Sequence, residues 1–359
     1  MQNKMKKLML MAICAMAMTT GCKQQGQKAP AEAATDSTSA EPTAKADAAP
    51  AKPLTPEQIA NAWKESPVKV KGGGQRPDIV TLCKAFNQAW PSDVMQLLLD
   101  EAKDPKFTQL TDENTGGGIE CDRKNGYVSV VAGDSDLDCM EAAVWQRKNG
   151  HRLLMVNLVT PKPDYRNLPE KQALCVYDYD PKTETMTPEE NVVSQFKPQK
   201  DGVSLMYRLP KNGTELSIGE GTTQPNARWH FFEWDGMKFA ETISYTEEEL
   251  DEKIIGAWMC KDKDEPLLTF VIANGEINGP EVEDCSIYGS TEYEAYASTW
   301  DGYLTISEGG GMDEEMNPAI KCRFRLTPQG ELTGTYYLRQ NGGKELRGTM
   351  TMKHGNPAW

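Results

Sequence analysis

Apolar residues recur at helical spacing in the first part of the chain that can bury a core, residues 55–102. The segment Thr55-Pro56-Glu57-Gln58 has the composition of a helix start, because threonine caps, proline suits the first helical position and the glutamine completes a capping box. Two further helices, over residues 78–90 and 92–102, are predicted on either side of Pro91. We expect this helical hairpin to lay one apolar stripe on a partner sheet.

Alternation of apolar and polar residues replaces the helical spacing from about Tyr127 to residue 244, as in strands with one buried face. Four segments read as a strand, a polar turn and a second strand. Their turns are Lys148-Asn149-Gly150, Asp180-Pro181-Lys182, Lys211-Asn212-Gly213 and Asp235-Gly236. Asn-Gly and Asp-Gly favour hairpins because both central residues can take a positive φ. Residues 55–244 are therefore predicted to form an α+β domain, with the helical hairpin packed on an antiparallel β-meander.

A second series of alternating segments starts after Thr246-Glu247-Glu248-Glu249. Seven short segments follow Trp258, separated by turns such as Asn274-Gly275, Asp301-Gly302 and Gln329-Gly330. With the segment that contains Trp258, they amount to eight antiparallel strands within residues 250–359. This pattern predicts a closed up-and-down β-barrel and makes the whole chain mainly β.

The segment Gly256-Ala257-Trp258 resembles the G-x-W that opens the first strand of lipocalin-like and avidin-like barrels, the calycin group. The resemblance covers the last third of the chain and implies an eight-stranded lipocalin-like barrel. It implies a structural role for Gly256 and Trp258 at the closed end, with a late-strand arginine, here Arg347, lying across the tryptophan. The chain is shorter than a typical lipocalin, so we expect the barrel cavity to be small or filled by side chains.

The N-terminus carries the pattern of an export signal. Three lysines precede an unbroken apolar run, Leu8 to Met18, which is shorter than the roughly 20 residues that cross a bilayer. Thr19-Thr20-Gly21-Cys22 follows and resembles the lipobox of Gram-negative bacterial lipoproteins, although Thr19 stands where a leucine is usual. The resemblance implies a signal peptide over residues 1–21 and acyl chains on Cys22. An ordinary secretory signal, cleaved nearby, is the alternative.

Residues 22–54 read as a lipid-anchored tether. Between Lys23 and Pro53 there is no Leu, Ile, Val, Phe, Met, Tyr or Trp, so this segment cannot bury enough apolar area to offset its ordering entropy. Some lipoproteins carry an aspartate after the anchor that retains them in the inner membrane, and others carry an acidic cluster that directs them to the cell surface. Neither follows Cys22, so the resemblance implies the periplasmic face of the outer membrane, with the cell surface as the alternative.

The charge of the chain argues against nucleic-acid binding. The sequence has 39 basic and 53 acidic residues, a net charge of −14, and removal of residues 1–21 takes away three lysines and no acids, which gives −17. An acidic body without a dense basic run repels nucleic acid and anionic membrane surfaces. The expected partners are the membrane, through the lipid anchor, and a small molecule, a glycan or a protein.

The sequence offers little that could carry catalysis. Seven cysteines remain beyond Cys22, and none of them forms the C-x-x-C pair of zinc or redox sites. The histidines, His151, His230 and His354, are well separated, and His230 and Glu233 lie three positions apart, on opposite faces of a strand. There is no P-loop, G-x-S-x-G or H-E-x-x-H motif. We therefore predict no enzymatic activity and no cofactor.

One acidic stretch has the spacing of a metal-binding loop. Asp134, Asp136 and Asp138 occupy positions 1, 3 and 5 of an EF-hand-like pattern, which supplies the oxygen ligands that calcium needs. Position 6 is Cys139 rather than glycine, and position 12 is Trp145 rather than glutamate. A calcium loop and a solvated acidic turn are both compatible with this stretch.

Three functions fit these observations. The first is binding of a small apolar or amphipathic ligand inside the C-terminal barrel, since barrels of eight strands can enclose one small ligand. Aromatic residues that could line its mouth are Tyr288, Tyr296, Trp300, Tyr303 and Tyr336, for which core packing is the other explanation. The second is an envelope interaction, inhibitor or assembly module with a filled barrel. The third is carbohydrate binding by exposed aromatic residues. The sequence assigns no function to residues 55–244.

Overall fold

The structure is a computed structural model, and its described residues belong to one compact unit, Pro50–Trp359. They are residues 52–111, 117–131, 139–160, 171–197, 203–211, 214–221, 227–260, 268–274, 280–287, 291–292, 295–299, 301–308, 320–339 and 345–355. The predicted signal peptide, Cys22 and most of the tether lie outside them. Within these ranges, no helix is both long enough and apolar enough to cross a bilayer.

Eight antiparallel strands form the first sheet, in the order β1-β8-β7-β6-β5-β4-β3-β2. The strands are β1 (Val68–Lys69), β2 (Gln109–Thr111), β3 (Gly118–Asp122), β4 (Tyr127–Val131), β5 (Cys139–Gln146), β6 (Arg152–Thr160), β7 (Lys171–Asp180) and β8 (Thr185–Pro188). The sequence pattern placed the start of the sheet near Tyr127, whereas three strands precede that residue. Because β1 and β2 are edge strands of two or three residues, they show no alternation long enough to be detected.

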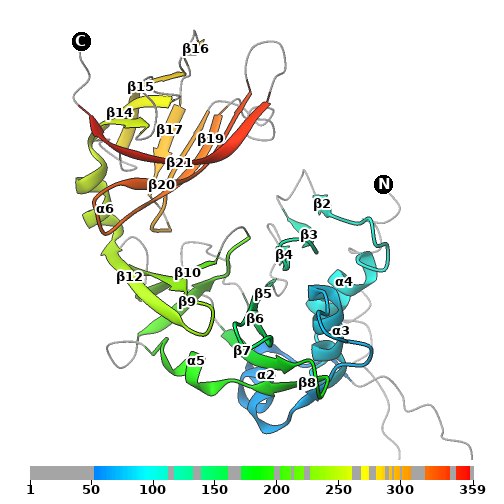
Figure 1. The fold of residues 1–359 in the computed structure, drawn as a ribbon. Helices are drawn as coiled ribbons and strands as arrows, with labels where there is room; N and C mark the ends of the chain where they lie inside the picture. The colour runs from blue at the N-terminus through cyan, green and yellow to red at the C-terminus, as the bar shows by residue number, and fades with distance from the viewer. Residues whose placement is uncertain are drawn as a thin grey trace, which may run out of the picture. The chain divides into compact units, whose positions relative to one another are not determined.

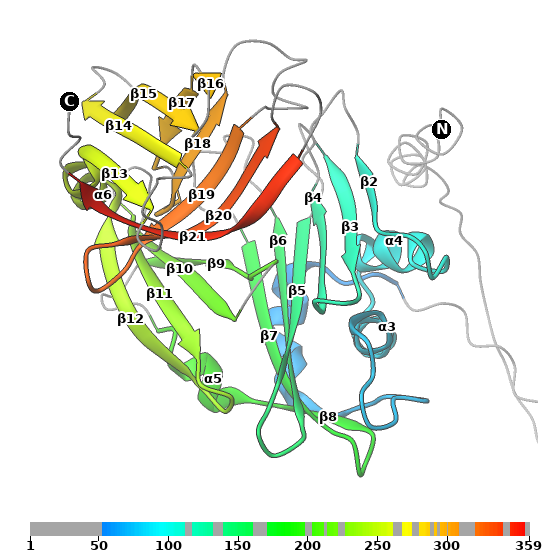
Figure 2. The ribbon, with the colours of Figure 1, turned by 45° about the horizontal axis from the view of Figure 1, so that its top comes forward.

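Short helices pack against this sheet. They are α2 (Pro56–Ala62), the 3₁₀ turn η1 (Trp63–Glu65), α3 (Ile79–Ala89) and α4 (Asp93–Glu101). The capping box at the start of α2 is formed, since Gln58 N donates to Thr55 Oγ1 over 3.3 Å and Thr55 N donates to Gln58 Oε1 over 2.9 Å. The buried faces of α3 and α4 contact β3, β4 and β5 (Figure 2).

The region predicted as one meander contains a second sheet. Its order is β12-β11-β10-β9. The strands are β9 (Ser204–Arg208), β10 (Glu215–Gly221), β11 (Arg228–Trp234) and β12 (Phe239–Thr246), and α5 (Glu190–Ser194) precedes them. Its strand β11 is apolar on both faces, because Trp229 and Phe231 are buried on one side while Phe232 is buried on the other. This strand is therefore covered on both sides, and no strand of the second sheet pairs with a strand of the first.

The third sheet follows α6 (Glu247–Ile254) and is nearly closed into a barrel (Figure 1). Its order is β14-β13-β21-β20-β19-β18-β17-β15-β16, and β14 also pairs with β15. The strands are β13 (Gly256–Cys260), β14 (Leu268–Asn274), β15 (Pro280–Ile287), β16 (Thr291–Glu292), β17 (Ala295–Ser298), β18 (Leu304–Glu308), β19 (Ile320–Leu326), β20 (Leu332–Arg339) and β21 (Glu345–Gly355). The seven segments predicted after Trp258 coincide with β14, β15 and β17–β21, and β16 is an additional short strand.

Two hydrophobic clusters meet at the second sheet. The first cluster joins the helices and the first sheet to Leu216, Ile218, Phe232 and Phe239. The second joins the opposite face of the second sheet, with Met206, Trp229, Phe231 and Tyr245, to α6 and the barrel. Burial therefore continues across residues 244–250, where the sequence pattern predicted a domain boundary.

Candidate functional site

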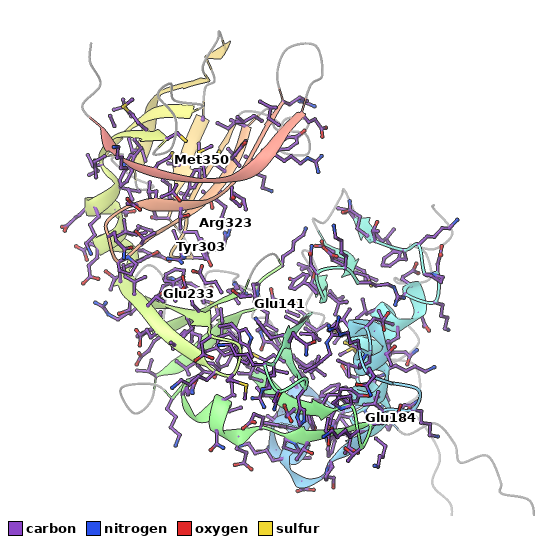
Figure 3. The ribbon with its side chains drawn as sticks, viewed as in Figure 1. Glu141, Glu184, Glu233, Tyr303, Arg323 and Met350 are labelled. Atoms are coloured by element: carbon purple, nitrogen blue, oxygen red, sulfur yellow. The ribbon has the colours of Figure 1, made fainter. Side chains whose placement is uncertain are left out.

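The predicted barrel aromatics are only partly within the described residues. Tyr288 and Trp300 lie outside them, and Tyr296 belongs to β17 but its side chain is outside them. Tyr303 directly precedes β18 and contacts the second sheet. Its ring meets Phe231 edge-on at 5.2 Å, the Arg323 guanidinium lies 3.9 Å above it, and its hydroxyl donates to Glu215 Oε1 over 3.2 Å. Figure 3 shows Tyr303 and Arg323 close together. Burial raises the pKa of the Tyr303 hydroxyl, as expected for a packed group rather than a ligand contact at an open mouth.

Tyr336 also packs against other residues of the barrel sheet. It lies on β20, half-buried against the second hydrophobic cluster. Its hydroxyl is only 2.9 Å from where a Cβ on Gly348 would stand, so Gly348 makes room for the tyrosine. Tyr303 packs on the second sheet and Tyr336 packs on β21, so each tyrosine has a structural role.

The described part of the barrel interior is filled. Alternate residues of β18–β21 have no exposed surface at all, namely Leu304, Ile306, Ile320, Cys322, Phe324, Leu332, Leu338 and Met352. A side chain next to an empty space wide enough for water would show exposed surface to that space. These eight side chains therefore touch one another and their neighbours, and they do not line an open ligand cavity.

The barrel motif has a partner that the sequence did not indicate. Trp258 is fully buried, its Nε1 donates to the carbonyl of Ile254 over 2.6 Å, and its ring lies 4.0 Å from the ring of His354. A Cβ on Gly256, whose φ is +126°, would come within 3.2 Å of the same imidazole. Arg347 lies seven positions before His354 on β21, is exposed and pairs with Glu345 at 2.5 Å. The structure thus places His354, and not Arg347, against Trp258.

The predicted metal loop, Asp134, Asp136 and Asp138, lies outside the described residues. Among the residues that are described, no group of three or more His, Cys, Asp or Glu side chains could hold a metal ion. Among the described cysteines, Cys83, Cys121, Cys175 and Cys260 are free thiols. Burial raises the pKa of Cys83, Cys121 and Cys175, which disfavours the reactive thiolate at these three positions.

A cavity of about 160 Å³ opens on the second sheet, away from the barrel interior. It is lined by Gln195, Phe196, Lys197, Leu205, Ile218, Glu220, His230, Phe232 and Glu241. Strands β9–β12 supply six of these residues, and the three others follow α5. Apolar side chains and several polar groups converge here.

His230 is held between two carboxylates in this cavity. Its Nδ1 lies 2.8 Å from Glu241 Oε1 and its Nε2 lies 3.2 Å from Glu220 Oε2. Only 7% of the imidazole side chain is exposed, compared with 11% of Glu220 and 44% of Glu241. Both ring nitrogens of His230 therefore lie within hydrogen-bonding distance of a carboxylate oxygen.

A β-bulge brings Glu241 to this face. Phe231 pairs with Ile243, whereas the next residue, Phe232, pairs with Glu241, so Thr242 is the extra residue of β12. Thr242 Oγ1 donates to the carbonyl of Phe231 over 3.1 Å at the same point. In a regular ladder Glu241 would point to the opposite face, because side chains alternate along a strand.

The sequence pattern correctly separated His230 from Glu233, but it missed Glu220 and Glu241. No local signal could have found them. Glu220 comes from the neighbouring strand β10, and the bulge at Thr242 has no marker such as a glycine. The cluster can accept hydrogen bonds from donor groups. It offers no free imidazole nitrogen for proton transfer, since both ring nitrogens are engaged.

Comparison with known proteins does not indicate a family or a function for this chain. No family model matches the chain, and no curated protein matches it. A solved structure, of a domain of an uncharacterized protein from Porphyromonas gingivalis W83, is similar with a TM-score of 0.31 and 12% identity. The alignment covers 47% of this chain and 98% of that one. Similarity at this level carries no argument about function.

Proposed function

We propose that this chain is a non-enzymatic binding protein of the cell envelope, anchored by lipid on Cys22, with its ligand site in the cavity around His230. The observation that carries the proposal is the convergence of Glu220, His230 and Glu241 with apolar side chains in one cavity of about 160 Å³. The lipobox-like segment before Cys22 supports the anchor and the periplasmic face of the outer membrane.

Binding is favoured over catalysis by the state of the reactive groups. A general base needs a free nitrogen or oxygen directed at the substrate, and both nitrogens of His230 already bond to carboxylates. A nucleophilic cysteine needs an accessible thiolate, and the Cys83 and Cys175 thiols are fully buried.

A second candidate function, an interaction or assembly module, is favoured by the filled packing in the part of the barrel interior that the structure describes. In that case the lipocalin-like barrel has no ligand of its own. Its packed face supports α6 and the second sheet through Leu250, Ile254, Trp229 and Tyr245.

Amide chemical shifts would test the proposed function. Residues 23–359, expressed without lipid, are titrated with a set of fragment-sized compounds that covers cationic, anionic and neutral classes. We expect at least one compound to shift the amides of β10–β12 around Glu220, His230 and Glu241. His230→Gln should weaken that response, whereas His151→Gln, directly before β6 of the first sheet, should leave it unchanged.

Two results would overturn the proposal. Shifts confined to β13–β21 would place the ligand in the barrel. The absence of any response at β10–β12 to every class of compound would favour the interaction module.

A further inference from the structure

We infer that the ligand of the His230 cavity is a small organic cation, a primary ammonium or a guanidinium group on a short apolar chain. This inference rests on the proposed function, because it names the chemical class that the same cavity would bind. It starts from the charged groups of the lining: two carboxylates, one lysine and one histidine.

The carboxylates provide the polar part of the site. An ionised carboxylate has about four lone-pair positions, so one bond to His230 uses only part of the acceptor capacity of Glu241. Glu241 is 44% exposed and can be reached from solvent, whereas Glu220 lies deeper, at 11%. Acceptor-only groups select ligands that donate hydrogen bonds, and positive charge strengthens those bonds.

The apolar part of the lining would hold the hydrocarbon part of the ligand. Phe196 and Phe232 meet edge to face at 5.3 Å and 79°, and Leu205 and Ile218 also contribute to the wall. A cavity of about 150 Å³ is enough for one benzene molecule. The cavity here therefore suits an alkyl or aryl group of roughly six heavy atoms or fewer, with its charge directed at Glu241.

The carboxylates of the lining and the net charge of the chain favour a cationic ligand over an anionic one. An anion would face both Glu220 and Glu241, and the chain as a whole carries a net charge of −14, which repels anions and attracts cations. Lys197 is the opposing group. It is exposed at the rim, where a long side chain can keep its ammonium in water. Removal of the Lys197 charge should therefore tighten the binding of a cation, an effect that a purely structural role would not produce.

A titration with three matched probes tests the inference on residues 23–359. The probes are n-butylammonium, the neutral 1-butanol and the anionic butyrate, each followed through the amide shifts of β10–β12. We expect n-butylammonium to bind at least about tenfold more tightly than either of the others. Glu241→Gln should weaken it about three- to tenfold, and Lys197→Met should strengthen it about two- to threefold. Glu248→Gln removes the same charge at an exposed position of α6, outside the cavity, and should change the affinity by less than twofold.

The outcomes separate the inference from the proposed function. Binding of 1-butanol or butyrate at β10–β12 as tightly as n-butylammonium would overturn the cation inference and leave the site in place. Equal losses in Glu241→Gln and Glu248→Gln would also overturn it, because the effect would then be general charge. If none of the three probes binds at β10–β12 but another fragment does, only the inference fails. If no fragment of any class binds there, both fail.

Discussion

The indole of Trp229 and the carboxyl group of Glu247 are buried together: Nε1 of Trp229 donates to Oε1 of Glu247 over 3.2 Å, and Glu247 is only 4% exposed. Glu247 is the first residue of α6, so the bond joins β11 of the second sheet to the helix that leads into the barrel. Burial raises the pKa of Glu247 to about 8, and Asp301 and Asp251 add to the shift while the bond from Trp229 opposes it.

Stability should therefore fall as the pH rises between about 4.5 and 8. In this window the folded protein keeps the Glu247 proton and the unfolded chain has lost it, so each increase in pH favours unfolding. The shift corresponds to at most about 5 kcal/mol. Urea unfolding from pH 5 to pH 9 measures the effect. The free energy of unfolding of the wild type minus that of Glu247→Gln should change with pH in this window. The same difference between the wild type and Glu248→Gln should not. The prediction would be contradicted if the difference in unfolding free energy between the wild type and Glu247→Gln did not depend on pH.

Gly302→Ala should be more destabilising than Gly330→Ala. Both glycines have a positive φ, +76° and +75°, so both substitutions incur a backbone cost of about 1 kcal/mol. A Cβ on Gly302 would also lie 2.5 Å from Cγ of the Trp229 ring, while a Cβ on Gly330 would have open space. Overpacking adds roughly 1–3 kcal/mol, so we expect a difference of that size in the free energy of unfolding. Equal losses in the two variants would show that the loop with Gly302 does not press on Trp229.

Tyr245→Phe should cost about 1–3 kcal/mol of stability. The hydroxyl is buried, donates to the carbonyl of Gly302 over 2.8 Å and accepts from the amide of Leu326 over 3.3 Å. Its removal leaves buried backbone groups of the barrel without their partner. Tyr337→Phe is the matched control, because its hydroxyl bonds to Glu345 at an exposed position and its loss should cost less than about 0.5 kcal/mol. Chemical denaturation of both variants compares them directly, and a larger loss in the control would count against the prediction.

Cys22→Ser should release the protein from the membrane fraction if lipid is attached at this residue. Several acyl chains hold a protein far more firmly than electrostatic contacts of an acidic chain could. Cys14→Ser, inside the predicted signal, leaves the lipobox-like segment unchanged and should leave the protein in the membrane fraction. Fractionation of cells that express each variant, followed by mass spectrometry of the N-terminal peptide, measures both the location and the modification. An unmodified Cys22 in the wild-type protein would support the ordinary secretory signal instead.

Local elements were predictable because their signals are local. The capping box of α2 and the strand segments from β17 to β21 follow from residues a few positions apart, and the Asp235-Gly236 and Gln329-Gly330 turns do have positive φ at their glycines. The short edge strands β1 and β2 were missed, since strands of two or three residues carry no period. The candidate site was missed as well, because it joins side chains from different strands.

The sequence by itself therefore determined the mainly β character of the chain, its acidic charge and the order of its alternating segments. Only the tertiary structure decided that β9–β12 form a separate sheet, that His354 lies against Trp258, and that His230 lies between Glu220 and Glu241. The physical reason is register. A strand shows its own two faces, but the partner strand, the pairing offset and a single bulge at Thr242 decide which side chains meet.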